Sequence, residues 1–122
     1  MNSNLRKGLQ YEDLARDYLI EQGLGLLQSN YRCRFGEIDL IMHDGDVICF
    51  VEVKFRRSLA FGGAAVALPQ GKQRKIIKSA RLYIATNTRL GNRALRFDAF
   101  LIQRQPNGAN EFNWIRNAFY AE

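Results

Sequence analysis

The chain has 122 residues, 47% of them hydrophobic, and a net charge of +6 at neutral pH; this length suits one compact domain over residues 1–122. One histidine and two cysteines without metal-ligand spacing argue against a zinc site and favour reduced, buried thiols. No apolar run approaches a membrane span and the first residues form no signal-peptide core, so we expect a cytoplasmic protein with no membrane partner.

The first predicted element is a helix from about Asn4 to Gln22, which Gly23 ends. Glu12 lies at the margin of the apolar stripe of this helix. It is either a boundary carboxylate that reaches water or part of a site beside the helix, and the pattern leaves both open. A short strand follows at about residues 24–31. The stripe itself has the spacing of one buried helix face: Tyr11, Leu14, Ala15, Tyr18 and Leu19.

Residues 36–54 predict a β-hairpin, because two arms rich in β-branched and aromatic residues flank an Asp44-Gly45 pair. A two-residue turn at this pair places Asp39 opposite Phe50 and Glu37 opposite Glu52. A three-residue turn would reverse one strand, so the prediction depends on the turn. With the two-residue turn, one face carries four charged side chains: Glu37, Asp39, Glu52 and Lys54.

Three neighbouring carboxylates on a sheet face repel one another and are costly to bury. Magnesium removes that cost, since it prefers oxygen ligands and usually takes one or two carboxylates. Asp39 and Glu52 have the spacing to share an ion, and Lys54 would stand beside it to hold a water molecule or a phosphate. The structural alternative is an exposed face with Glu-Lys pairs, and the opposition of Glu37 and Glu52 argues against it.

The charges of the chain are divided unevenly. Residues 1–53 hold five basic and nine acidic residues, whereas residues 54–122 hold thirteen and three. An acidic cluster within a basic protein suits a site that binds a cation and attracts a polyanion, although basic side chains can also simply solvate a surface. Downstream of the hairpin, Gly62-Gly63 predicts a mobile loop over its charged face. Four arginines flank the hairpin: Arg32, Arg34, Arg56 and Arg57.

A second helix starts at Pro69 or Gln70 and runs to about Thr86. Gln73 projects into its apolar stripe, where it either satisfies local backbone groups or reaches a site. The opposite, basic face is either solvated or follows a phosphate backbone. The stripe consists of Ile76, Ile77, Ala80, Tyr83 and Ile84.

Two further strands are predicted, at about residues 95–102 and 112–118. Phe112 and Trp114 share a face of the second one and are better explained by sheet packing than by base stacking. The order is helix, three strands, helix, two strands. It predicts an α/β sandwich in which helices cover a mixed sheet.

The hairpin resembles the signature of the PD-(D/E)XK nuclease superfamily, in which an acidic residue on one strand precedes Glu-X-Lys on the next. Asp39 supplies the acid and Glu52-Val53-Lys54 the triplet, while Ile38 stands where the proline of the signature would be. More closely, the chain resembles the YraN-like family of small bacterial candidate endonucleases over nearly its whole length. The resemblance rests on Gly36-Glu37-Ile38-Asp39-Leu40-Ile41, Phe50-Val51-Glu52-Val53-Lys54, Lys72-Gln73, Arg96-Phe97-Asp98 and Asn117-Ala118-Phe119.

This resemblance implies a restriction-endonuclease-like three-layer sandwich with an α-β-β-β-α-β core. It implies that Glu12 reaches the metal from the first helix, and Gln73 resembles a glutamine that some members carry on the second helix. The full proposed shell then holds Mg²⁺ or Mn²⁺ through Asp39, Glu52, Glu12 and the Val53 carbonyl, with Gln73 and Glu37 completing it.

The expected function is a metal-dependent endonuclease that hydrolyses phosphodiester bonds of nucleic acid, with DNA, branched DNA included, as the expected substrate. A homodimer would suit the cleavage of a junction, which requires two sites. The rival expectation is a non-catalytic nucleic-acid-binding or assembly protein that retains the fold. The side chains expected to hold the nucleic-acid backbone are Arg32, Arg34, Arg56, Arg57, Lys72 and Lys75.

Overall fold

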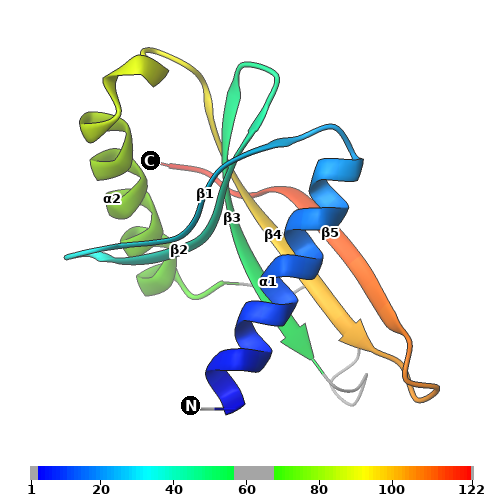
Figure 1. Cartoon of the computed structure of the whole chain (residues 1–122). Coiled ribbons are helices and arrows are strands. Elements are labelled where there is room, and N and C mark those ends of the chain that lie inside the picture. The colour runs from blue at the N-terminus through cyan, green and yellow to red at the C-terminus, as the bar shows by residue number, and fades with distance from the viewer. Residues whose placement is uncertain (1–2, 57–67, 122) are drawn as a thin grey trace.

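The computed structural model describes residues 3–56 and 68–121, with side chains from Gln10 onward within these ranges. Arg57 and the Gly62-Gly63 pair of the predicted loop lie outside the described residues. The predicted α/β class and element order are confirmed (Figure 1). The elements are α1 (Ser3–Glu21), β1 (Gly25–Cys33), β2 (Gly36–Asp44), β3 (Val47–Arg56), α2 (Gln70–Thr86), the 3-10 helix η1 (Thr88–Leu90), β4 (Leu95–Arg104) and β5 (Asn110–Phe119).

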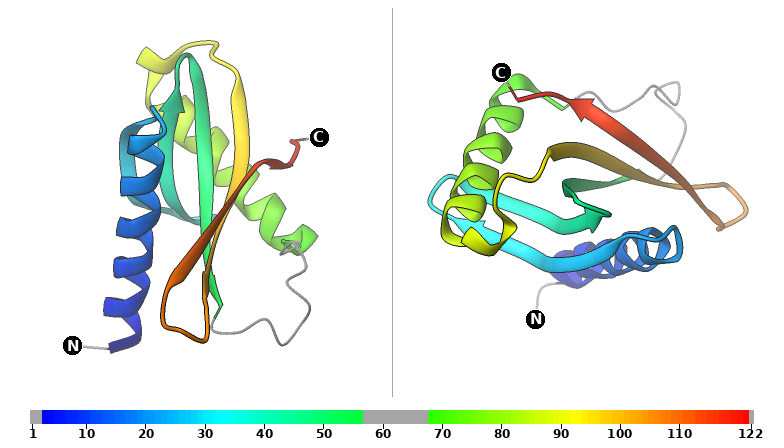
Figure 2. Two further views of the ribbon diagram at one scale, coloured as in Figure 1. Left: turned by 90° about the vertical axis from the view of Figure 1, so that its right-hand side faces the viewer. Right: turned by 90° about the horizontal axis from the view of Figure 1, so that it is seen from above.

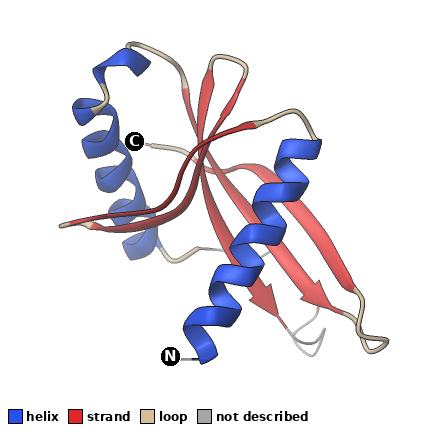
Figure 3. Cartoon of the chain, in the orientation of Figure 1, coloured by secondary structure: helices blue, strands red, loops and turns tan. Residues whose placement is uncertain are grey.

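The five strands form one mixed sheet in the order β1-β2-β3-β4-β5. Only β3 and β4 run parallel, and α2 lies in the connection between them, as parallel neighbours require a crossover. The other neighbouring pairs are antiparallel. The helices α1 and α2 cover opposite faces of the sheet, which makes three layers (Figures 2 and 3). Within the described ranges, neither helix is both long and apolar enough to cross a membrane.

Each face of the sheet has its own apolar core. On the α1 side, Ala15 and Leu19 pack on Leu40, Val51 and Phe100 with other buried residues. Leu14 was predicted in the same stripe but is 38% exposed and lies outside this core, so the sheet contacts a narrower strip of α1 than the periodicity suggests. The α2-side core comprises Ile38, Ile41, Ile48, Phe50, Leu68, Ile76, Ala80, Tyr83, Phe97 and Phe119.

The turn between β2 and β3 lies one residue further along the chain than predicted. The turn residues are Gly45 and Asp46, so that Asp44 pairs with Val47 and Ile41 pairs with Phe50. Gly45 has a φ of +59°, and Asp46 is not among the described residues with positive φ. A two-residue turn with glycine in its first position follows the type II′ pattern, whereas the Asp-Gly turn that the sequence suggested would need positive φ at aspartate.

Beyond Leu40, β2 separates from β3. Leu40–Val51 is the last registered pair of the two strands, although β2 continues back to Gly36. Ile38 packs in the α2-side core and Leu40 in the α1-side core, so the alternation of faces breaks at Asp39 between them. Figure 1 shows the β1–β2 hairpin curving away from β3 toward α2. This divergence opens the sheet at Asp39.

A bulge between β4 and β5 is organised around Asp98. Phe97 pairs with Phe119 and Ala99 with Ile115, so the residues between Ile115 and Phe119 loop out, with Asn117 at a φ of +54°. Asp98 is fully buried and accepts hydrogen bonds from the Asn117 backbone N–H (3.1 Å), the Trp114 indole (3.0 Å) and the Arg96 guanidinium (3.0 Å). The segments Arg96-Phe97-Asp98 and Asn117-Ala118-Phe119 are therefore joined as one structural clamp. Phe112 and Trp114 pack against the α1-side core, as predicted.

Candidate functional site

Asp39 lies where β2 separates from β3, and its side chain accepts a backbone N–H of β3. Its Oδ2 accepts the backbone N–H of Val53 at 2.8 Å. Extending the observed register places Asp39 directly opposite Glu52, not opposite Phe50 as predicted. The correction moves β3 by two residues relative to β2, and because side chains alternate with a period of two, both acids still share a face.

Glu52 is buried, with 4% of its surface exposed. Its Oε2 lies 3.3 Å from the Nζ atom of Lys72, which comes from the first turn of α2. Its Oε1 is buried and has no hydrogen-bond partner among the described residues. A buried carboxylate oxygen without a partner is costly, so this position calls for a cation or a donor.

Glu12 reaches the same region from α1, on the other face of the sheet. Its carboxyl group interacts with Asp39 and accepts a hydrogen bond from the side chain of Asn30, while its Oε2 is buried without a hydrogen-bond partner among the described residues. The opening between β2 and β3 is what allows a residue of the α1 layer to meet an acid of the α2 layer. Carboxyl groups from two further elements, Glu12 of α1 and Glu52 of β3, therefore lie near that of Asp39.

The three carboxyl groups cannot all remain ionised without compensation. Burial, with a contribution from the charge of Asp39, raises the pKa of Glu12 to about 8 and that of Glu52 to about 7. Burial likewise raises the pKa of Asp39, against the lowering effect of the Val53 N–H. Crowded, buried acids of this kind hold protons near neutral pH unless a metal ion replaces the protons.

Two lysines complete the electrostatics. Burial and the nearby charge of Lys72 lower the pKa of Lys54, while Glu52 and Asp39 act in the opposite direction. For Lys72, burial works against the charged form, but the contacts with Glu52 and Lys54 outweigh it and raise its pKa. Lys72 is thus the charged partner of the carboxylates, and Lys54 is the more easily deprotonated of the two amines.

A groove of about 570 Å³ opens onto these residues between the β1–β2 hairpin and the start of α2. Glu12 and Lys54 do not line the groove. Glu12 interacts with Asp39, and Lys54 interacts with Lys72, and these two partners do line it. The residues that line it are Gly36, Glu37, Asp39, Glu52, Val53, Gly71, Lys72, Lys75 and Ile76.

The metal shell predicted from the sequence is only partly assembled. Among the described residues, no group of three or more His, Cys, Asp or Glu side chains stands in position to hold a metal ion together. Asp39, Glu52 and Val53 face the groove, whereas Glu12 meets Asp39 from the α1 side. Glu37 lines the groove but is exposed and pairs with Arg32 at 3.4 Å.

Gln73 does not reach this groove. Its Nε2 donates to the Leu68 backbone carbonyl at 2.7 Å, and its side chain lines a different cavity on the other side of α2. Of the two interpretations that the sequence left open, the structure therefore favours local backbone satisfaction. The Gln73 amide thus satisfies a backbone carbonyl just before α2 begins. The sequence pattern alone could not show that this carbonyl lies within reach.

Only part of the residues predicted to contact nucleic acid line the groove. Lys75 lines it, and Lys72 enters the carboxylate cluster instead of remaining on the outer face. The Arg34 guanidinium lies over the Phe35 ring at 4.8 Å. Arg56 is half-buried near the end of β3, and Arg57 lies outside the described residues.

Sequence reasoning missed Asn30. The register of β1 against β2 places it opposite Asp39, and its φ of +53° marks a kink in β1 at the same level. Its side chain bonds Glu12. An asparagine within a predicted strand was the available signal, because asparagine tolerates the left-handed conformation better than most residues.

The chain belongs to the uncharacterised protein family UPF0102, whose family model matches residues 11–102. That range contains Glu12, Asp39, Glu52, Lys54 and Lys72. A UPF0102 protein of Nitrosomonas europaea is 50% identical over 119 residues, which are 98% of each chain. A UPF0102 protein of Stutzerimonas stutzeri is 44% identical, and the match covers 98% of each chain. A UPF0102 protein of Saccharophagus degradans is 45% identical, and the match covers 92% of this chain and 91% of the relative.

Proposed function

We propose that this protein is a metal-dependent endonuclease that hydrolyses phosphodiester bonds of nucleic acid, with DNA as the expected substrate. The proposal places it in the PD-(D/E)XK superfamily with a restriction-endonuclease-like fold, as a YraN-like protein. It would act in the cytoplasm, where its free thiols, Cys33 and Cys49, stay reduced.

The observation that carries the proposal is the pair of orphaned oxygens, Glu12 Oε2 and Glu52 Oε1, on either side of Asp39. Buried carboxylate oxygens are normally hydrogen-bonded, paired or bound to metal. The atoms that could bind a metal here are carboxylate and carbonyl oxygens, which suit Mg²⁺ or Mn²⁺ and do not suit a soft metal. The residues present therefore fit a hard divalent cation.

Asp39 and Glu52 would hold the ion, with Glu12 and the Val53 carbonyl as further ligands. When bound, the ion supplies Lewis-acid stabilisation of the phosphoryl oxygens and makes a coordinated water more acidic. Lys54, with its lowered pKa, would orient the attacking water and take up or share its proton. The water oxygen bonds to phosphorus as one P–O ester bond breaks, and the leaving oxygen takes a proton from solvent.

Lys72 and Lys75 would hold the phosphates on either side of the scissile bond, since both line the groove. Arg32, which pairs with Glu37 at the rim, would meet the backbone next. The helix α2 contains five basic residues and no acidic residue, so the wall of the groove that it forms attracts a polyanion.

The test is cleavage of branched, single-stranded and duplex DNA and of RNA with Mg²⁺ or Mn²⁺, by the wild type and by Glu52→Gln. We expect metal-dependent cleavage by the wild type and a loss of at least about a hundredfold in Glu52→Gln, with nucleic-acid binding retained. Mn²⁺ should raise the Tm of the wild type but not that of Asp39→Asn, in which the amide oxygen can still accept the Val53 N–H.

The rival function is a non-catalytic nucleic-acid-binding or assembly protein that retains the fold. It predicts metal-independent binding, no cleavage of any substrate and no effect of Mn²⁺ on the Tm. Equal cleavage by the wild type and Glu52→Gln would show that the activity lies elsewhere or comes from a contaminant, and would overturn the proposal.

A further inference from the structure

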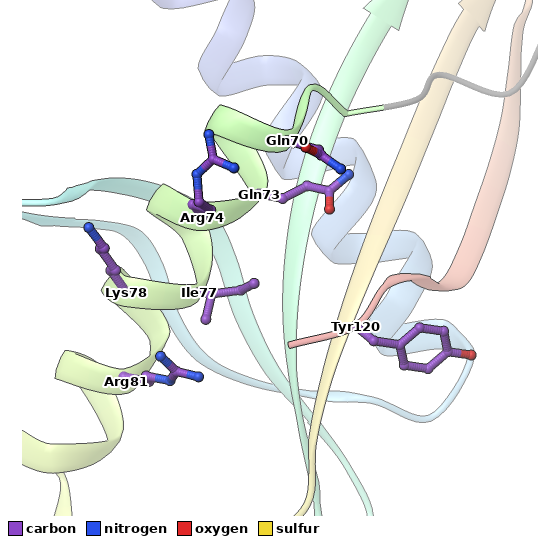
Figure 4. Close-up of a pocket in the computed structure, with 7 residues that line it drawn as sticks. All are labelled: Gln70, Gln73, Arg74, Ile77, Lys78, Arg81 and Tyr120. Carbon is purple, nitrogen blue, oxygen red and sulfur yellow. The ribbon is translucent and has the colours of Figure 1, made fainter. Parts of the chain in front are cut away.

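The amide group that meets the carboxylates of the site comes from β1 and not from α2. The sequence suggested Gln73 for such a role, but its side chain helps to line the cavity shown in Figure 4 and donates to the Leu68 carbonyl. Asn30 of β1 instead forms a side-chain hydrogen bond with Glu12. An ionised carboxylate can only accept hydrogen bonds, so the amide N–H₂ of Asn30 is the donor.

The backbone of Asn30 is unusual for a residue within a strand. Asn30 and Asn117 are the two non-glycine residues with positive φ in the described part of the chain, at +53° and +54°. For Asn117 the reason is the bulge between β4 and β5, where Asp98 accepts its backbone N–H. The pairs on either side of Asn30 stay in register, so no inserted residue explains its conformation. A left-handed residue kept without such a cause points to a role for its side chain.

Asn30 lies at the point where the β1–β2 hairpin changes from one face of the sheet to the other. Directly paired residues share a face, and the pairs before and after Asn30 belong to different cores of the molecule. These pairs are Ser29–Leu40 on the α1 side and Tyr31–Ile38 on the α2 side. The register therefore places Asn30 opposite Asp39, at the level of the sheet opening through which Glu12 reaches the site.

The hydrogen bond accounts for the inward position of Glu12. Glu12 and Asp39 repel each other when both are ionised, and a glutamate at the margin of a helix stripe can turn to water instead. A donor on the other side of Glu12 opposes that movement. Oε2 of Glu12 is buried without a hydrogen-bond partner among the described residues, so the bond to Asn30 is made by Oε1. One oxygen is thus held, and the other stays free for a cation.

We propose that Asn30 is the positioning residue for Glu12: its left-handed backbone directs the amide to one carboxylate oxygen and leaves the other, Oε2, to bind the metal ion beside Asp39. The inference rests on the proposed function and deepens it, because it names the residue that brings a ligand from the α1 layer to the metal site. Partners that orient metal ligands in this way typically contribute roughly 10–100-fold to metal affinity.

The test is isothermal titration calorimetry of the full chain with Mn²⁺ at pH 8.5. Asn30→Gly removes the amide but keeps a residue that adopts positive φ readily, and it should weaken Mn²⁺ binding about tenfold. In the Glu12→Ala background, Asn30→Gly should change Mn²⁺ affinity by less than about twofold, because the carboxylate that it positions is gone. Asn117→Gly is the matched control, since it removes an asparagine side chain at the same φ on β5, and it should bind Mn²⁺ within about twofold of the wild type.

A second measurement needs no substitution at residue 30. In NMR spectra of the metal-free protein, Glu12→Ala should move the side-chain amide proton resonances of Asn30 toward those of a solvated amide, because their acceptor is lost. Asp13→Ala, at the neighbouring exposed carboxylate of α1, should leave these resonances unchanged. Unchanged Asn30 resonances in Glu12→Ala would overturn the inference.

The calorimetry separates this inference from the proposed function. Wild-type Mn²⁺ affinity in Asn30→Gly, or an equal loss in the presence and absence of the Glu12 carboxylate, would overturn the role of Asn30, and a wild type that binds Mn²⁺ and cleaves DNA would then keep the proposed function. If the variants behave as expected but no nucleic acid is cleaved with any metal, the endonuclease proposal fails and the role of Asn30 stands. A wild type that binds no Mn²⁺ would overturn both.

Discussion

At the scale of single residues, Lys72 is the side chain whose position most changes the interpretation of the site. Its ammonium lies against Glu52, where it neutralises a buried carboxylate in the absence of a divalent cation. The same amine lines the groove and is 43% exposed, so it can move toward a phosphate. Lys72 is thus a counter-ion for the site without metal and a candidate phosphate ligand with it.

We therefore expect Lys72→Gln to bind Mn²⁺ more tightly than the wild type, by roughly threefold to tenfold, because the competing positive charge is gone. The measurement is isothermal titration calorimetry at pH 8.5, where the raised pKa values of Glu12 and Glu52 no longer leave either acid mostly protonated. Cleavage should nevertheless slow, because the phosphate contact is lost.

Lys75→Gln is the matched control for this prediction. Lys75 lines the same groove one turn further along α2 and is not among the described ion-pair partners of Glu52. Its loss should leave Mn²⁺ affinity within about twofold of the wild type. Weaker Mn²⁺ binding in Lys72→Gln would show that Lys72 supports the metal site and does not compete with the ion.

Glu12 and Gln73 show how far a residue-level prediction reaches. Both are polar residues at or near an apolar helix stripe, and the sequence indicated a site role for each while leaving a local role open. Glu12 meets Asp39, but Gln73 bonds the Leu68 carbonyl. Periodicity shows which way a side chain points, and it does not show whether a backbone acceptor lies within reach.

At the scale of the elements, the β4–β5 clamp holds the sheet where its ladder is broken. The bulge leaves the Asn117 N–H without a strand partner, and Asp98 accepts it. The same carboxylate is paired with Arg96, which also bonds Asp44 at 3.0 Å and so ties the β2–β3 turn to β4. A buried charge with this many partners stabilises the fold only while all of them remain.

Asp98→Asn should lower the free energy of unfolding by roughly 3–5 kcal/mol, because it leaves Arg96 without its buried partner and turns an amide N–H₂ toward other donors. The measurement is urea denaturation followed by circular dichroism. Asp46→Asn, in the exposed β2–β3 turn, is the control and should change stability by less than about 0.5 kcal/mol. A loss below about 1 kcal/mol in Asp98→Asn would mean that the clamp is not a major stabilising feature.

The hairpin shows why a wrong turn still predicted the right face for the charged side chains. The predicted Asp44-Gly45 turn and the observed Gly45-Asp46 turn differ by an even number of residues in register. Asp39, Glu52 and Lys54 therefore keep their common face, although their opposite partners change. The turn type depends on φ at aspartate, which a sequence pattern does not determine.

At the scale of the whole molecule, alternation and helical periodicity were enough to predict the layers and the order of the elements. The opening of the sheet was not predictable from them. It lies beside the kink of β1 at Asn30, where the β1–β2 hairpin turns to pack against α2, a contact between segments far apart in the sequence. The meeting of Glu12 with Asp39 depends on this opening.

The raised pKa values of the site also make a prediction about the stability of the metal-free protein. Glu12 and Glu52 have an ordinary pKa of 4.5, which rises to about 8 and about 7 in the folded chain, with burial as the largest cause. Between pH 4.5 and pH 8 the folded protein therefore binds more protons than the unfolded chain. Stability falls as the pH rises through this window, and the loss is complete above it.

In EDTA, the Tm should thus be higher at pH 6 than at pH 8.5, as measured by differential scanning calorimetry. The double variant Glu12→Gln and Glu52→Gln carries no titrating group at either position, so its Tm should change less between these two pH values. Saturating Mn²⁺ should restore the Tm of the wild type at pH 8.5, because the cation replaces the lost protons. If the wild type and the double variant lose the same Tm between pH 6 and pH 8.5, the two acids are solvated in the folded chain and the crowding of the carboxylates around Asp39 is not real.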